Sequence, residues 1–311
     1  RIAENTVRLN AKSDYEGATT VSSGATVYAV AGALGDTSKL TVEGTGSMHV
    51  DGSNAVRALA VNENGSLWIG NTDIEHPSDD ITLTLKSDET AGSVIAGSLR
   101  GTGNLAVEGN GQVDAGYKPD LSITSSTGGF HGDLVLDKGA WVELATDTNT
   151  IFGSNDPSLS NDILVSEASR LTINSTSTET VSLFGVFRDG SNDVEDNDEH
   201  GGTVIMHLGA ADSKFQFARE QEEMAVQEGK DLFTGTLQLT QGTIDFTDLY
   251  NGDEDDLQKT ALHGTTLVLG DNANLVLGDN ADAARELGGL TMAGGTIHEA
   301  QSSEDRLRRR C

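Results

Sequence analysis

The feature that most constrains this chain is a pattern of an aromatic residue, two glycines and an apolar residue at fixed spacing. The pattern is aromatic-x-Gly-x-x-x-apolar-x-x-Gly, and it occurs at Tyr15 to Gly24, at Phe130 to Gly139 and at Phe233 to Gly242. Between the two glycines the residues alternate in polarity, as Leu237 and Leu239 do with their polar neighbours, which is typical of a strand with one buried face. Each copy therefore predicts a strand, a glycine turn and a second strand.

A shorter motif lies between these copies and consists of a turn pair followed by apolar-x-apolar. It occurs at Asn64 to Ile69, Thr102 to Val107, Glu167 to Ile173 and Asp271 to Leu277. We interpret it as one corner and one face of a coil that is used repeatedly. Because such a unit cannot bury its apolar face alone, successive units must stack, and their strands then pair into long parallel sheets. The sequence predicts an all-β solenoid in which loops of different length obscure any strict period.

Composition fits a narrow, stacked core. The chain has 311 residues, 36% of them hydrophobic, with 37 glycines and only 3 prolines. Proline is confined to evident loops, as expected if central strands must keep their N–H groups for the ladder. No segment approaches the roughly 18 apolar residues of a membrane-spanning helix. We expect a single elongated domain over residues 1–300, with on the order of 11 to 15 coils.

The charge balance excludes several classes of partner. The chain carries 49 acidic against 20 basic residues, a formal net charge of −29. Nucleic acids and anionic membranes are bound through Lys and Arg, so neither is expected as a partner. The one cysteine is Cys311, so no intramolecular disulfide can form and stability must come from the stacked coils.

Both ends of the sequence suggest a fragment. The first copy of the pattern begins only a few residues into the chain, with no basic-then-apolar signal segment before it. The basic ending RLRRRC contrasts with the acidic, glycine-rich chain that precedes it. We expect residues 301–311 to be a disordered or expression-derived tail and exclude them from fold reasoning.

The segment KSDYEGATTVSSGATVYAVAGALGDTSKLTVEG resembles the passenger-associated transport repeat of bacterial autotransporters. The other two copies are similar more loosely, and Asp282 to Ile297 resembles sequence from the C-terminal part of such passengers. The resemblance covers about half the chain. It implies a right-handed parallel β-helix, exported by a C-terminal barrel that the sequence lacks, and a place at the cell surface, in the outer membrane or in the secreted fraction.

No motif indicates catalysis. The Gly-Asp-Ser-Gly nucleophile motif of serine-protease passengers is absent, and the seven histidines show no metal-site spacing. We therefore expect no catalytic residue, no metal site and no cofactor. The alternative is a β-helical carbohydrate-active enzyme, either a polysaccharide lyase or a glycoside hydrolase, whose carboxylates would meet across coils. Such an enzyme needs aromatic and basic residues along a groove, and both are scarce in this sequence.

Two acidic runs, Asp189 to His200 and Asn251 to Asp256, interrupt the strand pattern and predict loops at coil corners. Their oxygen ligands would suit Ca²⁺, but neither run has the spacing of an EF-hand or of a calcium-binding β-roll, so a plain solvated loop is favoured and calcium stays open. As candidate binding residues we take the carboxylates Asp189, Asp193, Glu195, Asp196, Asp198, Asp253, Asp255 and Asp256.

These features favour a surface adhesin that binds without catalysis along its length. The resemblance implies self-association with passengers on neighbouring cells, leading to aggregation and biofilm formation. A host glycan or a matrix protein is the other expected partner. Many weak polar contacts, summed along an extended face, would supply the affinity.

Overall fold

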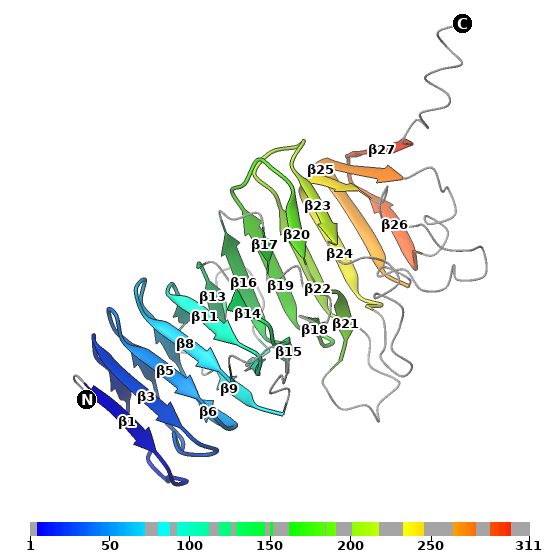
Figure 1. The fold of residues 1–311 in the computed structure, drawn as a ribbon. Coiled ribbons are helices and arrows are strands. Elements are labelled where there is room, and N and C mark those ends of the chain that lie inside the picture. Colours follow the sequence, from blue (N-terminus) through cyan, green and yellow to red (C-terminus); the bar gives the residue numbers. More distant parts are fainter. Residues whose placement is uncertain are drawn as a thin grey trace, which may run out of the picture.

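The computed structural model describes residues 5–71, 80–87, 92–111, 118–125, 129–146, 150–151, 162–183, 185–190, 201–217, 233–245, 264–277 and 287–299. Within these ranges the chain is all-β, with 27 strands and no helix. The strands lie in parallel sheets stacked along an elongated molecule, and the longest sheet extends over most of its length (Figure 1). The prediction of an all-β fold with parallel sheets is confirmed.

Three sheets carry most of the strands, and we call them A, B and C. Sheet B consists of β1 (Asn5–Leu9), β3 (Ala25–Ala29), β5 (Ser47–Val50), β8 (Ser66–Ile69), β11 (Ser98–Gly101) and β14 (Gly129–Phe130). Sheet C consists of β6 (Asn54–Val56), β9 (Thr82–Lys86), β12 (Asn104–Glu108), β15 (Leu134–Asp137), β18 (Ile163–Val165) and β21 (Phe187–Asp189).

Sheet A is the longest and spans the described part of the chain. Its main row is β2 (Thr19–Val21), β4 (Leu40–Val42), β7 (Leu59–Val61), β10 (Ser93–Ile95), β13 (Leu121–Ile123), β16 (Trp141–Thr146), β19 (Arg170–Ser175), β22 (Thr203–His207), β24 (Thr236–Asp245), β25 (Thr266–Leu277) and β26 (Gly289–Met292). A second row of sheet A holds β17 (Thr150–Ile151), β20 (Val181–Leu183), β23 (Lys214–Phe217) and β27 (Thr296–Glu299), joined to the main row through β24 and β25.

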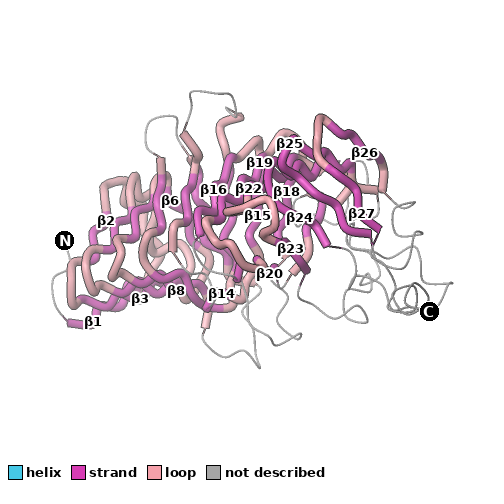
Figure 2. Tube along the Cα trace, turned by 90° about the horizontal axis from the view of Figure 1, so that it is seen from above, coloured by secondary structure: helices cyan, strands magenta, loops and turns pink. Residues whose placement is uncertain are grey.

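Successive strands of the chain join different sheets in a repeating order, and we call one repeat of this order a pass. From β4 to β16 the order along the chain is A, B, C, repeated, and each strand pairs in parallel with the strand one pass earlier. From β16 to β23 the order is main row of sheet A, second row of sheet A, sheet C. The second row of sheet A thus replaces sheet B in each pass. Eleven described strands follow one another along the main row. Figure 2 shows these passes side by side along the length of the molecule.

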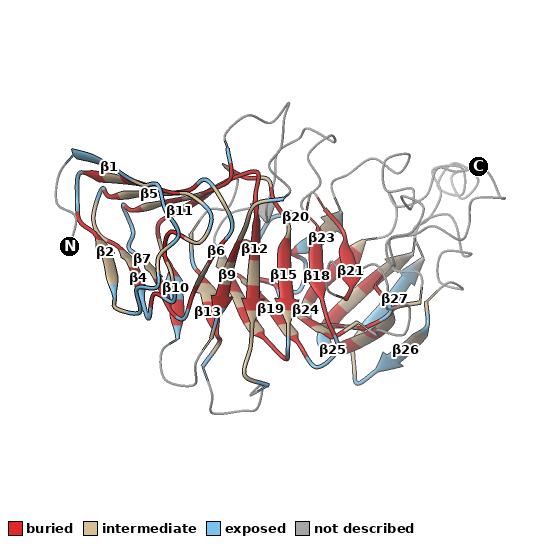
Figure 3. Cartoon of the chain, turned by 90° about the horizontal axis from the view of Figure 1, so that it is seen from below, coloured by how far each residue is buried: buried red, intermediate tan, exposed pale blue. Residues whose placement is uncertain are grey.

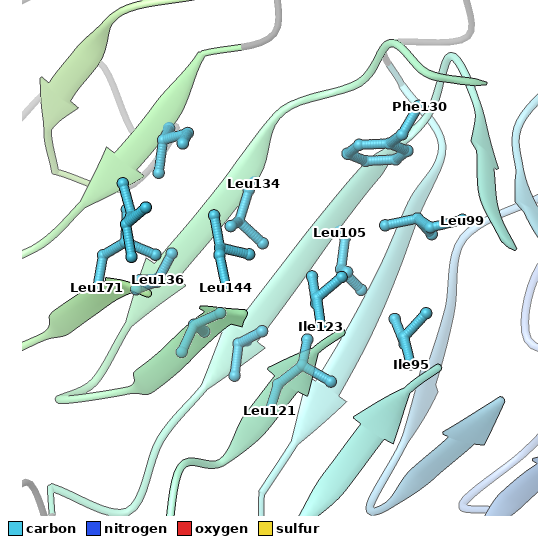
Figure 4. Packing of buried hydrophobic residues seen from close by; sticks show 14 of the residues in the cluster. Ile95, Leu99, Leu105, Leu121, Ile123, Phe130, Leu134, Leu136, Leu144 and Leu171 are labelled. Carbon is cyan, nitrogen blue, oxygen red and sulfur yellow. The ribbon is translucent and has the colours of Figure 1, made fainter. Parts of the chain in front are cut away.

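The core is a continuous apolar column between the sheets. Burial alternates along the strands, so that in β8 Leu67 and Ile69 are fully buried while Ser66 and Trp68 are half-buried on the outward side. Ile95 and Leu105 from one pass, and Ile123 and Leu136 from the next, belong to one buried apolar cluster in the interior (Figure 4). Figure 3 shows the buried residues along the strands of every sheet. The leucines predicted to face inward, Leu136, Leu239 and Leu275, are all fully buried.

The second glycine of each long pattern has a left-handed backbone, with φ of 81° at Gly24, 71° at Gly139 and 116° at Gly242. In the first two copies this glycine separates two strands, as predicted. The third copy corrects the prediction, because β24 runs through Gly242 as a single strand. A register shift between Leu239 and Gln241 bends this strand, so a bulge replaces the turn.

The repeated motifs do not mark a single corner. The first long copy leads from sheet A to sheet B, and the second leads from sheet C to sheet A. The short motif likewise precedes strands of sheet B at β8, of sheet C at β12 and of sheet A at β19. The interpretation as one corner used repeatedly is therefore wrong, since the motif specifies a turn and a strand but not which sheet the strand joins.

Side chains join successive passes at the corner before sheet C. Asn104 Oδ1 accepts the N–H of Asp133 at 2.9 Å, Asp133 Oδ1 accepts the N–H of Asp162 at 2.9 Å, and Asp162 Oδ1 accepts the N–H of Val186 at 3.2 Å. The buried Asp162 also pairs with the Arg188 guanidinium. This chain of bonds satisfies backbone donors that the turn would otherwise leave unpaired.

Candidate functional site on the outward face of sheet B

The outward face of sheet B carries two columns of side chains in register. The column of hydroxyl groups is Thr6, Thr26, Ser47, Ser66 and Ser98. The neighbouring column is Arg8, Tyr28, His49, Trp68 and Arg100, and we call it the Arg–aromatic ladder. Each of the five strands β1, β3, β5, β8 and β11 contributes one member to each column because outward side chains recur every second residue.

The ladder forms one uninterrupted stack. The rings of Tyr28 and His49 lie 4.5 Å apart and those of His49 and Trp68 lie 5.5 Å apart, both nearly parallel. The Arg8 guanidinium lies 4.4 Å from the centre of the Tyr28 ring, and that of Arg100 lies 5.3 Å from the Trp68 ring. Both ends of the aromatic stack are therefore covered by cations, a favourable arrangement for the ring quadrupoles.

The stacking decides which atoms a ligand can reach. Ring faces in the stack are covered by the next ring or by a guanidinium, so a sugar cannot lie flat on them. Tyr28, His49 and Trp68 are half-buried at outward positions of their strands. A guanidinium that stacks on a ring keeps its N–H donors in its own plane, free of that contact. The face thus presents edges and donors instead of open aromatic platforms.

Sheet B is also free of acidic residues along its strands. None of its six strands contains Asp or Glu, although the whole chain has 49 such residues. Arg8 and Arg100 are exposed, and among the described residues neither forms an ion pair. The outward groups of these strands are therefore hydroxyls, aromatic rings, one histidine and two cations, and the exposed Asp51 directly after β5 is an acidic residue close to them.

His49 lies at the centre of the ladder, between Tyr28 and Trp68. Burial between the two rings lowers the pKa of His49, and the nearby charge of Asp51 acts in the opposite direction. A ring nitrogen of His49 lies 3.0 Å from the Ser47 hydroxyl, which links the two columns. The lowered pKa favours the uncharged ring at neutral pH, so the positive charge of the ladder comes from the two arginines.

A similar contact on sheet A has different surroundings. Arg170 lies 5.4 Å from the ring centre of Trp141, whose Nε1 donates to Thr172 at 3.1 Å. On the same strand as Trp141, however, Glu143 accepts hydrogen bonds from Ser122 and from Asn174. An arginine stacked on tryptophan therefore occurs on both sheets. Among the described residues, only the arginine–aromatic stack on sheet B has no carboxylate on its own strands.

The acidic candidates are placed only in part. Asp189 is not in a projecting loop as predicted, since it ends β21, is buried, and accepts hydrogen bonds from the N–H and hydroxyl of Thr234. It begins the acidic run in sequence, but strand pairing with β18 draws it into sheet C. The remaining candidates lie outside the described residues: Asp193, Glu195, Asp196, Asp198, Asp253, Asp255 and Asp256.

Sequence reasoning missed the ladder, although a signal for it exists. Five strands contain a hydroxyl residue, an apolar residue and then Arg or an aromatic residue: Thr6-Val7-Arg8, Thr26-Val27-Tyr28, Ser47-Met48-His49, Ser66-Leu67-Trp68 and Ser98-Leu99-Arg100. The copies are unevenly spaced, so the pattern becomes evident only once the strands are aligned by their pairing.

No group of three or more His, Cys, Asp or Glu side chains that could hold a metal ion occurs in the part of the chain that the structure describes. The same part contains no helix long and apolar enough to cross a membrane. Comparison of the chain with family models, with curated protein sequences and with solved structures finds no match.

Proposed function

We propose that this protein is a right-handed parallel β-helix of the autotransporter-passenger type, acting at the cell surface as an adhesin that binds without catalysis. The handedness is inferred from the parallel crossovers, which are right-handed in about 98% of proteins. The passenger assignment rests on the sequence resemblance, and the cyclic order of strands through the sheets supports it.

The observation that carries the binding role is the continuous outward face of sheet B. It holds donors in fixed positions over five consecutive strands, with no carboxylate on those strands to occupy them. A flat, extended face of this kind suits many weak contacts with an extended partner, whose sum gives avidity. Self-association between cells, or attachment to a host glycan or matrix protein, would use such contacts, and the acidic runs remain candidates for a second contact surface.

The test compares adhesion with catalysis. Beads coated with the protein should aggregate, or attach to surfaces carrying glycans or matrix proteins, and should do so less when Tyr28, His49 and Trp68 are changed together to serine. The matched control is Trp141→Ser on sheet A, which should leave attachment unchanged. Cleavage of a polysaccharide by the soluble protein, without aggregation or attachment, would instead support a carbohydrate-active enzyme.

A further inference from the structure

We propose that the outward face of sheet B binds an extended acidic polysaccharide whose carboxylate or sulfate groups are gripped by Arg8 and Arg100. This inference rests on the adhesive role proposed above and names the class of its ligand. It follows from three properties of the face, which are its donor chemistry, the spacing of its charges and its shape.

The donor chemistry selects an anionic, acceptor-rich ligand. Arg8, Arg100 and Trp68 can only donate hydrogen bonds, while the tyrosine and hydroxyl groups can donate or accept. No carboxylate lies within the strands of sheet B, and neither arginine forms an ion pair among the described residues; the exposed Asp51, directly after β5, places its charge near His49. A ligand with carboxylate or sulfate oxygens would form charge-assisted bonds with the guanidinium groups, which are stronger than bonds between neutral groups.

The two arginines are held in place before a ligand arrives. Each guanidinium is stacked on a ring, at 4.4 Å for Arg8 and at 5.3 Å for Arg100, and the position after Arg100 in its column is Gly129, which has no side chain. Stacking limits the rotamers of a long side chain that would otherwise lose entropy on binding. The donor edges of both groups can therefore be engaged at low entropic cost.

The spacing of the charges favours a sparsely charged polymer. Arg8 and Arg100 are separated by four strand-to-strand steps, about 19 Å at the usual interstrand distance. Duplex DNA carries a charge every ~1.7 Å, which two cations cannot match. A second copy of this chain, with a net charge of −29, would bring most of its own charge against the first. A thin polysaccharide with neutral units between its acid groups brings fewer negative charges to the face than either of these, so both the mismatch in spacing and the repulsion are smaller.

The shape of the face fits a linear chain. The two columns run straight along the stacking direction, with an outward hydroxyl at every strand step between the two arginines. Each step is about 4.8 Å, close to the length of one sugar unit in an extended chain. Neutral hydroxyls of the polymer can thus meet the Thr and Ser column while its acid groups reach the arginines.

The experiment measures binding of a fluorescently labelled hyaluronan octasaccharide to the full chain by polarisation, with dextran of similar length as the neutral probe. Hyaluronan should bind, dextran should not, and added salt should weaken binding because exposed charges are screened within about 8 Å at physiological ionic strength. The R8Q/R100Q variant should lose about tenfold in affinity or more, since each guanidinium contributes charge-assisted bonds.

The matched control is R170Q, which removes an arginine stacked on tryptophan from sheet A and should leave hyaluronan binding unchanged. If R8Q/R100Q unfolds at a lower temperature than wild type, R8K/R100K is measured as well. Lysine keeps the charges but lacks the planar guanidinium, so an affinity between those of wild type and R8Q/R100Q would support the proposal. Equal losses in R170Q and R8Q/R100Q, or tighter binding to single-stranded DNA than to hyaluronan, would overturn it.

The failure of this inference differs from failure of the adhesive role. If coated beads still aggregate or attach while hyaluronan does not bind, the ligand class is wrong and the adhesive role stands. If R8Q/R100Q abolishes self-association in sedimentation but not hyaluronan binding, the partner of the face is a second copy and the glycan proposal is overturned. If beads neither aggregate nor attach and hyaluronan does not bind, both proposals fail.

Discussion

The N-terminal and C-terminal regions both stack successive passes, but they divide each pass into strands differently. From β4 to β16 each pass is divided into short strands on sheets A, B and C, separated by turns. In β24 and β25 one long strand, of 10 and 12 residues respectively, covers both rows of sheet A. The difference shows that a corner need not interrupt pairing, since a bulge can bend a strand and keep its hydrogen bonds on both sides.

The largest expected effect tests whether the core is equally well packed in both regions. Leu136 on sheet C and Leu239 on β24 are both fully buried, so Leu136→Ala and Leu239→Ala should each lower the free energy of unfolding by ~2 to 5 kcal/mol. Thr41→Ala, at an outward position of sheet A, should change it by less than about 0.5 kcal/mol. Urea denaturation measures all three. A much smaller cost at Leu239 would mean that the bent strands pack loosely.

A smaller effect separates the two kinds of corner. An added Cβ at Gly242 would lie 2.6 Å from Leu208 Cδ1, a buried side chain, and the backbone φ there is 116°. Gly242→Ala should therefore cost ~1 to 3 kcal/mol through overpacking and strain. At Gly24, with φ of 81°, an added Cβ meets nothing within 4 Å, so Gly24→Ala should cost about 1 kcal/mol from the backbone alone.

Thermal melts of these two glycine variants provide the measurement, and the order of their melting temperatures is the result that matters. If Gly24→Ala were the more damaging, the bend in β24 would be more adaptable than a short turn between two sheets.

The smallest effect concerns pH and belongs to the N-terminal region. Burial lowers the pKa of His49 below its ordinary value of 6.5, so the unfolded chain takes up this proton more readily than the folded one. The free energy of unfolding should therefore fall as the pH drops through 6.5 towards the lower pKa of the folded state. Denaturation of wild type and His49→Gln at pH 7.5 and pH 5.5 checks this. A wild-type pH response identical to that of the variant would contradict it.

Local sequence predicted the strands and their buried sides well. Leu136, Leu239 and Leu275 are buried as expected because period-two alternation depends only on neighbours along the chain. Local sequence could not predict which sheet each strand joins. The loops between strands vary in length without a rule, so the spacing of the motifs does not indicate the sheet.

The candidate site was harder to predict for a related reason. Tyr28 meets His49, and His49 meets Trp68, only through the pairing of β3, β5 and β8. A ladder is a property of register between passes, so single-sequence spacing does not reveal it. For Asp189 the sequence predicted a feature that the structure does not have. The acidic composition of the run that it begins predicted a loop, but Asp189 is paired within a strand and buried.

The winding also determines how the molecule would respond to tension. The covalent chain runs around each pass, whereas hydrogen bonds such as those between β5 and β8 run along the length of the molecule. A load applied along that length is therefore borne by non-covalent bonds, and the weakest mechanical points are the end strands. Pulling should unwind the protein one pass at a time, each released residue adding at most ~3.6 Å of contour. Under the proposed adhesive role, a cell tethered through the protein would be held by an extensible link that lengthens in steps before it breaks.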